Sequence, residues 1–157
     1  MHTTHVDLSL DIRQQVIAIL NKRLADAVDL SIQVKLAHWN VRGKHFIALH
    51  ELFDKVVDSV KNSSDEIAER IGQLGGVVTG NVQEVVKNTS LGVFPSDISK
   101  GEDIVGALVQ GISTFANNCR KDIDNTDKLG DAVTADLLTA ITRETDKYLW
   151  FVEAHQQ

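Results

Sequence analysis

Residues 46–74 read FIALHELFDKVVDSVKNSSDEIAERIGQL, and this stretch decides the fold. Its apolar residues recur at intervals of three, four or seven, the spacing of a helix that buries one face in a bundle. Gly75 and Gly76 follow directly and predict the end of the helix. The residues on the expected core side are Phe46, Leu49, Phe53, Val56, Val60, Ile67, Ile71 and Leu74.

Similar periodicity predicts three more long helices. One runs from about Ser9 to Val41, one begins with capping-box spacing at Ser99 and Glu102, and one starts near Asp131. A short helix is expected over residues 81–88. The connection between the second and third long helices is long, about 25 residues, which is enough to cross a bundle from end to end. We therefore expect an all-α protein, a ferritin-like four-helix bundle with a short extra helix in the long crossover.

Five potential metal ligands occur within 32 residues: His38, His50, Asp54, Asp65 and Glu69. His50 and Asp54 are four residues apart, and so are Asp65 and Glu69, which on a helix directs each pair to one side. Imidazole nitrogens together with carboxylates suit iron, and positions left open on the metal suit redox chemistry. Ligand type alone also permits zinc as a competitor.

The two pairs lie too far apart to share an ion within one chain. Asp54 and Asp65 are separated by three turns, about 16 Å along the helix axis, whereas metal–ligand bonds are about 2 Å long. Either each pair binds its own metal, or a second chain runs antiparallel and brings its acidic pair to the histidines. A two-fold axis produces the second arrangement, and we prefer it on geometry. The chain has no Glu-x-x-His motif, which disfavours a di-iron site inside the bundle.

Composition restricts the partners and the compartment. The 157 residues carry a formal net charge of −6, and neither the first twelve nor the last nine include Lys or Arg, which argues against binding to DNA. We expect one domain over residues 1–157, with residues 1–8 flexible. No stretch resembles a signal peptide or a membrane span, and Cys119 is the only cysteine. These features lead us to expect a cytoplasmic protein.

Several motifs resemble the Dps family, the DNA-binding proteins from starved cells, also called mini-ferritins. They are KLAHWNVRG at 35–43, Leu49-His50, Phe53-Asp54, DEIAERI at 65–71, TADLL at 134–138 and DKYLW at 146–150. The resemblance extends over essentially the whole chain. It implies a hollow homo-dodecamer with a ferroxidase centre at each two-fold interface. Iron(II) would be oxidised there, by hydrogen peroxide in preference to dioxygen, and ferric mineral would be stored inside, protecting DNA and the cell from oxidative damage.

The resemblance also implies roles for individual residues. His38, His50 and Asp54 would come from one subunit and Asp65 and Glu69 from its two-fold partner. Trp39 matches a tryptophan beside the centre, although packing alone explains a tryptophan there. The acidic residues that would line a pore for iron are Asp131, Asp136 and Asp127; Asp131 also suits a helix cap. The lysine-rich tail of DNA-binding members is absent, so a nucleoid-associated, DNA-coating protein is only the alternative function. A bundle with a degenerate metal site is a third hypothesis.

Overall fold

The computed structural model describes all 157 residues and is entirely helical apart from one isolated bridge between Arg42 and Lys100. The all-α prediction is confirmed, and none of the helices is long and apolar enough to cross a membrane. The elements are α1 (Leu10–Asn40), α2 (Phe46–Gln73), α3 (Val82–Asn88), α4 (Gly101–Lys128), α5 (Ala132–Glu153) and a final 3-10 turn, Ala154–Gln156.

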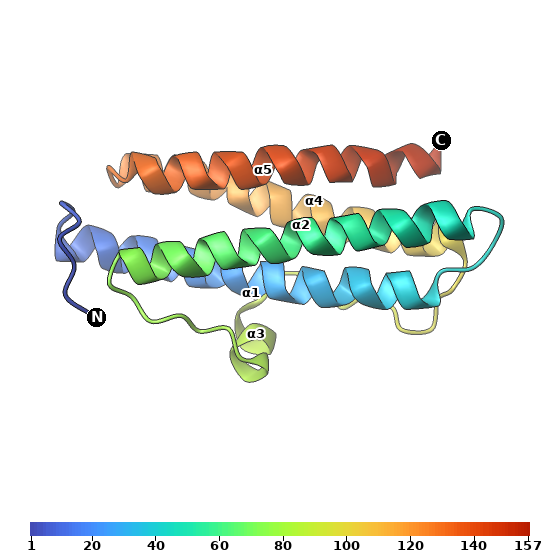
Figure 1. Ribbon diagram of the computed structural model, residues 1–157, viewed down its shortest axis with the longest axis horizontal. Helices are drawn as coiled ribbons and strands as arrows, with labels where there is room; N and C mark the ends of the chain where they lie inside the picture. The colour runs from blue at the N-terminus through green and yellow to red at the C-terminus, as the bar shows by residue number, and fades with distance from the viewer.

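The four long helices form two packed pairs, α1 with α2 and α4 with α5 (Figure 1). The chain leaves α2 at one end of the bundle and enters α4 at the other, so residues 74–100 run along its length and carry α3 against α1. The predicted crossover is therefore confirmed. The C-terminus lies at the end where α1 connects to α2 (Figure 1).

The core consists of the apolar faces that the periodicity predicted. Phe53 of α2, Phe115 of α4 and Leu138 of α5 are fully buried, as are Leu20 and Ile71. Each side chain of this size stabilises the fold by about 1.5–3 kcal/mol when removed from water. Because the core takes up one face of α2, a side chain one position after a core residue points away from the bundle centre.

Side chains cap the starts of α1, α3 and α5 but not those of α2 and α4. The hydroxyl of Ser9 caps α1 by accepting a hydrogen bond from the Ile12 amide (3.3 Å). At the end of α2, a Cβ on Gly76 would lie 2.8 Å from Ile71 Cγ2, so only glycine fits. The predicted capping box of Ser99 and Glu102 is wrong. The α4 cap is Lys100, which makes no side-chain cap bond.

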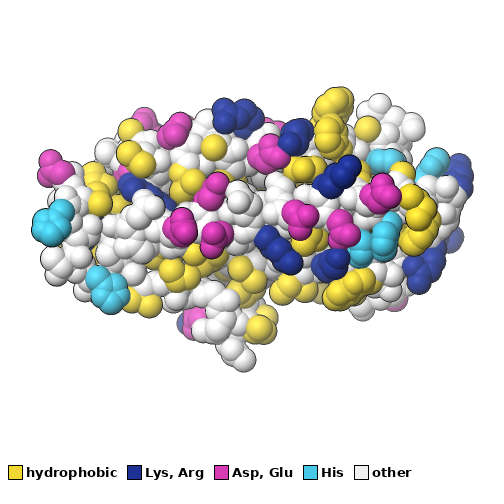
Figure 2. Space-filling model, in the orientation of Figure 1, with side chains coloured by type: hydrophobic (Ala, Val, Ile, Leu, Met, Phe, Trp, Pro, Cys, Tyr) yellow, Lys and Arg dark blue, Asp and Glu magenta, His cyan; other side chains and the backbone are white.

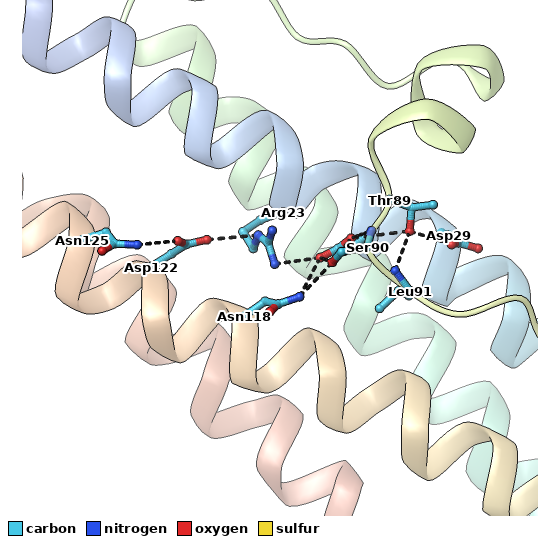
Figure 3. Close-up of polar contacts among 9 residues, drawn as sticks. Arg23, Asp29, Thr89, Ser90, Leu91, Asn118, Asp122 and Asn125 are labelled. Carbon is cyan, nitrogen blue, oxygen red and sulfur yellow. Dashed lines mark hydrogen bonds and ion pairs between the residues drawn. The ribbon is translucent and has the colours of Figure 1, made fainter.

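The crossover is fastened to the bundle by a buried polar network (Figure 3). Asp26 of α1 is fully buried and accepts hydrogen bonds from the amide (2.6 Å) and hydroxyl (2.9 Å) of Ser90. Arg23 lies between Asp26 (2.8 Å) and Asp122 of α4 (3.1 Å), while Asn118 donates to the Ser90 hydroxyl (2.8 Å). A buried carboxylate is stable only with such partners, so this network fixes the route of the crossover.

The first residues, which we expected to be flexible, lie against the end of α2. The amide of His2 donates to Gly75 O (2.6 Å), and the Thr4 hydroxyl donates to Gln73 O (3.1 Å). Val6 and Leu8 pack on the core. Backbone and side-chain bonds thus tie this segment to the helix that carries most of the predicted ligands.

Candidate metal centre

His38 and His50 lie against each other where α1 ends and α2 begins. Their rings are stacked, with centroids 3.6 Å apart and planes 23° from parallel. Nδ1 of His38 is 2.8 Å from His50 O, and Nδ1 of His50 is 2.9 Å from His38 O. Since a carbonyl oxygen only accepts, each Nδ1 carries a proton and donates. In a neutral imidazole this tautomer leaves the Nε2 lone pair free for a metal.

Asp54 joins this pair from the next turn of α2. Its Oδ1 lies 3.3 Å from His38 Nδ1 and 2.7 Å from Lys35 Nζ, and its side chain is half exposed. The hydrogen bond from Lys35 lowers the pKa of Asp54 below its ordinary value, so the carboxylate stays ionised and able to bind a cation.

Lys35 is a member of the site to which sequence reasoning gave no role. It precedes His38 by three residues, so it lies on the same side of α1, and this spacing was the available signal. Its ammonium lies against one of the two oxygens of the Asp54 carboxylate. A metal at Asp54 therefore competes with a cation already held there.

Asp65 and Glu69 do not join the histidines in a single chain. Both side chains are exposed on α2 and make no hydrogen bond or ion pair. No three His, Cys, Asp or Glu side chains of one chain come together in a way that could hold a metal ion. One chain thus offers an imidazole half-site and, farther along the same helix, a separate acidic pair.

Apolar side chains are exposed beside the half-site. Trp39, which follows His38, is 62% exposed, and Ile32, seven residues earlier on the same side of α1, is 57% exposed. Ile47 at the start of α2 is 60% exposed. Trp39 and Ile32 share one side of α1, and exposed apolar side chains on one side of a helix are typical of an interaction surface.

The three candidate pore residues have different environments. Asp136 and Asp127 are exposed, but Asp131 is buried at the start of α5. Asp131 accepts from the Thr134 amide (3.0 Å) and hydroxyl, and it pairs with Arg70 of α2 (2.9 Å). Burial alone would raise the pKa of Asp131, but the bonds from Thr134 and the charge of Arg70 outweigh it and lower the pKa. These contacts are those of a helix cap.

This chain is similar to known proteins over most of its length. The ferritin-like domain family matches residues 17–157. A DNA protection during starvation protein of Agrobacterium fabrum is 46% identical over 156 residues, covering 99% of this chain and 96% of that protein. Among solved structures, DpsC from Streptomyces coelicolor has a TM-score of 0.94 at 31% identity, covering 99% of this chain and 91% of that one.

A Dps protein from Vibrio cholerae superposes equally well. It has a TM-score of 0.92 at 26% identity, with 100% of this chain and 98% of that chain covered. That protein is described as a member of a broad superfamily of ferritin-like diiron-carboxylate proteins. The predicted donor set, two imidazoles and the carboxylates of Asp54, Asp65 and Glu69, is chemically compatible with a divalent transition metal.

Proposed function

This chain belongs to the Dps family of ferritin-like proteins, and we propose that it is a ferroxidase that stores ferric iron inside a hollow homo-dodecamer. Membership of this family supports iron storage and protection of DNA in general. The observation that carries the specific proposal is the stacked pair His38 and His50, each with its Nε2 free.

Each centre is completed by a second copy of the chain. In an antiparallel two-fold dimer the partner subunit's Asp65 and the partner subunit's Glu69 face His38, His50 and Asp54, which produces two equivalent centres. The distance along α2 and the exposed apolar side chains around Trp39 support this arrangement. Trp39 would then lie at the interface beside the metal.

Iron(II) is the substrate in this proposal. His38 and His50 bind it through neutral nitrogens, and Asp54 with the partner's acidic pair neutralises its charge. Two Fe(II) ions give one electron each to one hydrogen peroxide, which with two protons becomes two water molecules. Consuming iron and peroxide together prevents their reaction to hydroxyl radical. By family resemblance we propose peroxide in preference to dioxygen as the oxidant, in a cytoplasmic protein. The ligand types also allow zinc to compete with iron for the centre.

Acidic pores would lead iron to the cavity. Asp136 and Asp127 are exposed and provide the negative field that draws cations inward, while Asp131 shapes the pore by fixing the start of α5. Changing Asp136 to Asn should slow iron uptake without changing the rate at which peroxide oxidises iron already bound.

The test is stopped-flow absorbance of Fe(II) oxidation by peroxide. His38→Ala and Asp65→Ala should each slow it by more than tenfold, and unchanged rates in both variants would end the proposal. Light scattering should give a mass about twelve times the 17.3 kDa of the chain. A coat on DNA is the alternative function, but the net charge of −6 argues against it, and a low-salt gel shift would detect it.

A further inference from the structure

A cavity of about 280 Å³ opens at the end of the bundle where α1 finishes and where α2 and α4 begin. Leu49 and Val105 form its apolar floor, and two loops form its rim. The loops are joined because the Arg42 amide donates to Ser99 O (2.8 Å) and the Gly101 amide donates to Arg42 O (3.2 Å). The backbone therefore holds the hollow open without help from a ligand.

Cationic side chains line this cavity. Arg42, Lys44 and Lys100 all contribute, and none of them forms an ion pair with a carboxylate. His45 and His155 add two imidazoles, and Glu102 is the only acidic residue in the lining. Figure 2 shows Lys, Arg and His side chains gathered at this end of the molecule. Three unpaired cations in one hollow of a chain with net charge −6 favour an anion as the ligand.

The guanidinium of Arg42 is held in place by backbone. Its Nη1 donates to Val41 O (2.8 Å) and Trp39 O (3.3 Å), so Nη2 and Nε remain without a hydrogen bond in the chain. An arginine fixed through one nitrogen, with the rest of its fork free, is suited to an oxyanion, which accepts two parallel hydrogen bonds.

The helices that start at this cavity add to its positive field. The first residues of α1, α3 and α5 are capped by side chains, but the caps of α2 (His45) and α4 (Lys100) make no side-chain bond. The first amide of each helix is already used, Phe46 N by Gly43 O and Gly101 N by Arg42 O, but the next two amides of each have no acceptor in the chain. Free amides at a helix start bind anions. This supports the charge argument, which rests on the cavity and its unpaired cations.

We propose that this cavity binds the phosphate group of a small molecule, with inorganic phosphate as its simplest occupant. A phosphate presents several acceptor oxygens and a double negative charge to Arg42, Lys44 and Lys100. The hollow favours a small ligand over nucleic acid, because a duplex spreads its phosphates along a strip, whereas these three cations line one cavity. The site is distinct from the imidazole half-site, whose side chains do not line it.

Calorimetric titration of the iron-free, full-length protein with inorganic phosphate tests this, at ionic strength held constant with chloride. We expect saturable binding of one phosphate per chain, weakened at least tenfold by the double variant Lys44→Gln/Lys100→Gln. Both lysines are exposed, so circular dichroism should show the fold intact. The matched control is Lys121→Gln, an exposed and unpaired lysine of α4 outside the cavity, which should bind as the unmodified protein does.

Three outcomes would overturn the proposal. They are the absence of saturable phosphate binding, equal affinity in the double variant and the Lys121→Gln control, and binding of a DNA duplex through Lys44 and Lys100 by a protein that does not bind phosphate. The last result would assign the cations to nucleic acid instead.

Discussion

Lys35 links the charge of the imidazole half-site to its metal affinity. Its ammonium is 2.7 Å from Asp54 Oδ1, and both side chains are partly exposed, so the pair contributes at most about 1 kcal/mol to folding. Its larger effect is on a second cation, because an incoming metal must displace the ammonium or share the carboxylate with it. Lys35 therefore limits how tightly this half of the centre holds metal.

Removing that competitor should strengthen metal binding. Lys35→Gln is expected to raise the affinity for Co(II), a probe that peroxide-free buffer leaves unoxidised, by up to about fivefold, the equivalent of about 1 kcal/mol. Anaerobic calorimetry measures this, with Lys121→Gln as the control at an exposed lysine far along α4. Weaker binding in Lys35→Gln would instead mean that the lysine orients Asp54 for the metal.

For single residues, the sequence predicted which side chains belong to the half-site better than it predicted the contacts they make. The spacing selected His38 and His50, and the structure brings them together, but the reciprocal bonds from Nδ1 to carbonyl oxygens depend on how α1 meets α2. The role of Lys35 depends on the same meeting of helices. No local sequence pattern predicts either contact, so both were found only in the folded structure.

The contact between the end of α2 and the start of α5 depends on one buried ion pair. Arg70 donates from Nη2 to both oxygens of Asp131 (2.9 and 3.1 Å) and from Nε to Thr134 Oγ1 (2.9 Å). Asp131 in turn caps α5. The residue that resemblance placed at a pore thus also ties two helices together.

Breaking this ion pair should lower the free energy of unfolding, an effect not expected of a residue that only lines a pore. Asp131→Ala removes the cap and leaves Arg70 buried without its partner, an expected loss of about 3–5 kcal/mol. Urea unfolding measures it. Asp136→Ala, an exposed change on the same helix, should alter the unfolding free energy by no more than about 0.5 kcal/mol. Equal losses in the two variants would show that the ion pair contributes little.

The lowered pKa of Asp131 makes the stability of the fold depend on pH, and the sign of that dependence is known. A carboxyl whose folded pKa lies below its unfolded value of about 3.9 stabilises the fold above that value and loses this contribution as pH falls through the folded pKa. The Asp131→Asn variant has no such contribution to lose. The difference in unfolding free energy between the two proteins should therefore narrow from pH 5 downward, as denaturation at several pH values would reveal. A difference independent of pH would contradict the assignment.

Helix boundaries could be predicted where a capping residue or a glycine nearby in the sequence determines them. Ser9, Asn81 and Asp131 cap their helices as polar residues at such positions do, and Gly75-Gly76 ends α2. The start of α4 could not be predicted because Ser99 and Gly101 are drawn into backbone bonds with Arg42, 57 and 59 positions earlier in the sequence. A long-range pairing there replaces the local capping box.

At the scale of the whole molecule, the separation of donors along α2 matters most. A straight helix carries Asp65 and Glu69 away from His50 and Asp54, and the structure brings no three donors of one chain together for a metal. The separation of Asp65 and Glu69 from His50 and Asp54 followed from helix rise alone and required no knowledge of packing. The assembly that would unite the donors stays a prediction, supported by the exposed apolar residues around Trp39.

A centre shared between chains makes a prediction that no single-chain site makes. When His38→Ala and Asp65→Ala chains are unfolded together and reassembled, random pairing makes half of the dimers mixed. Each mixed dimer has one centre with both changes and one with neither. About a quarter of all centres should then be intact. The mixture should regain about that share of the unmodified protein's peroxide-dependent oxidation rate, although each variant alone is slowed by more than tenfold.

The matched control combines two changes on the same side of the interface. In a mixture of His38→Ala and His50→Ala chains, every centre takes its imidazoles from one altered chain, so no pairing restores activity. Recovery of activity in the first mixture and none in the second would show that each centre takes its donors from two chains. If neither mixture recovers while light scattering shows normal assembly, the metal is bound within one chain, and the two-fold centre is wrong. Equal recovery in both would mean that the His38 and His50 of one centre come from different chains, which would contradict the imidazole half-site proposed here.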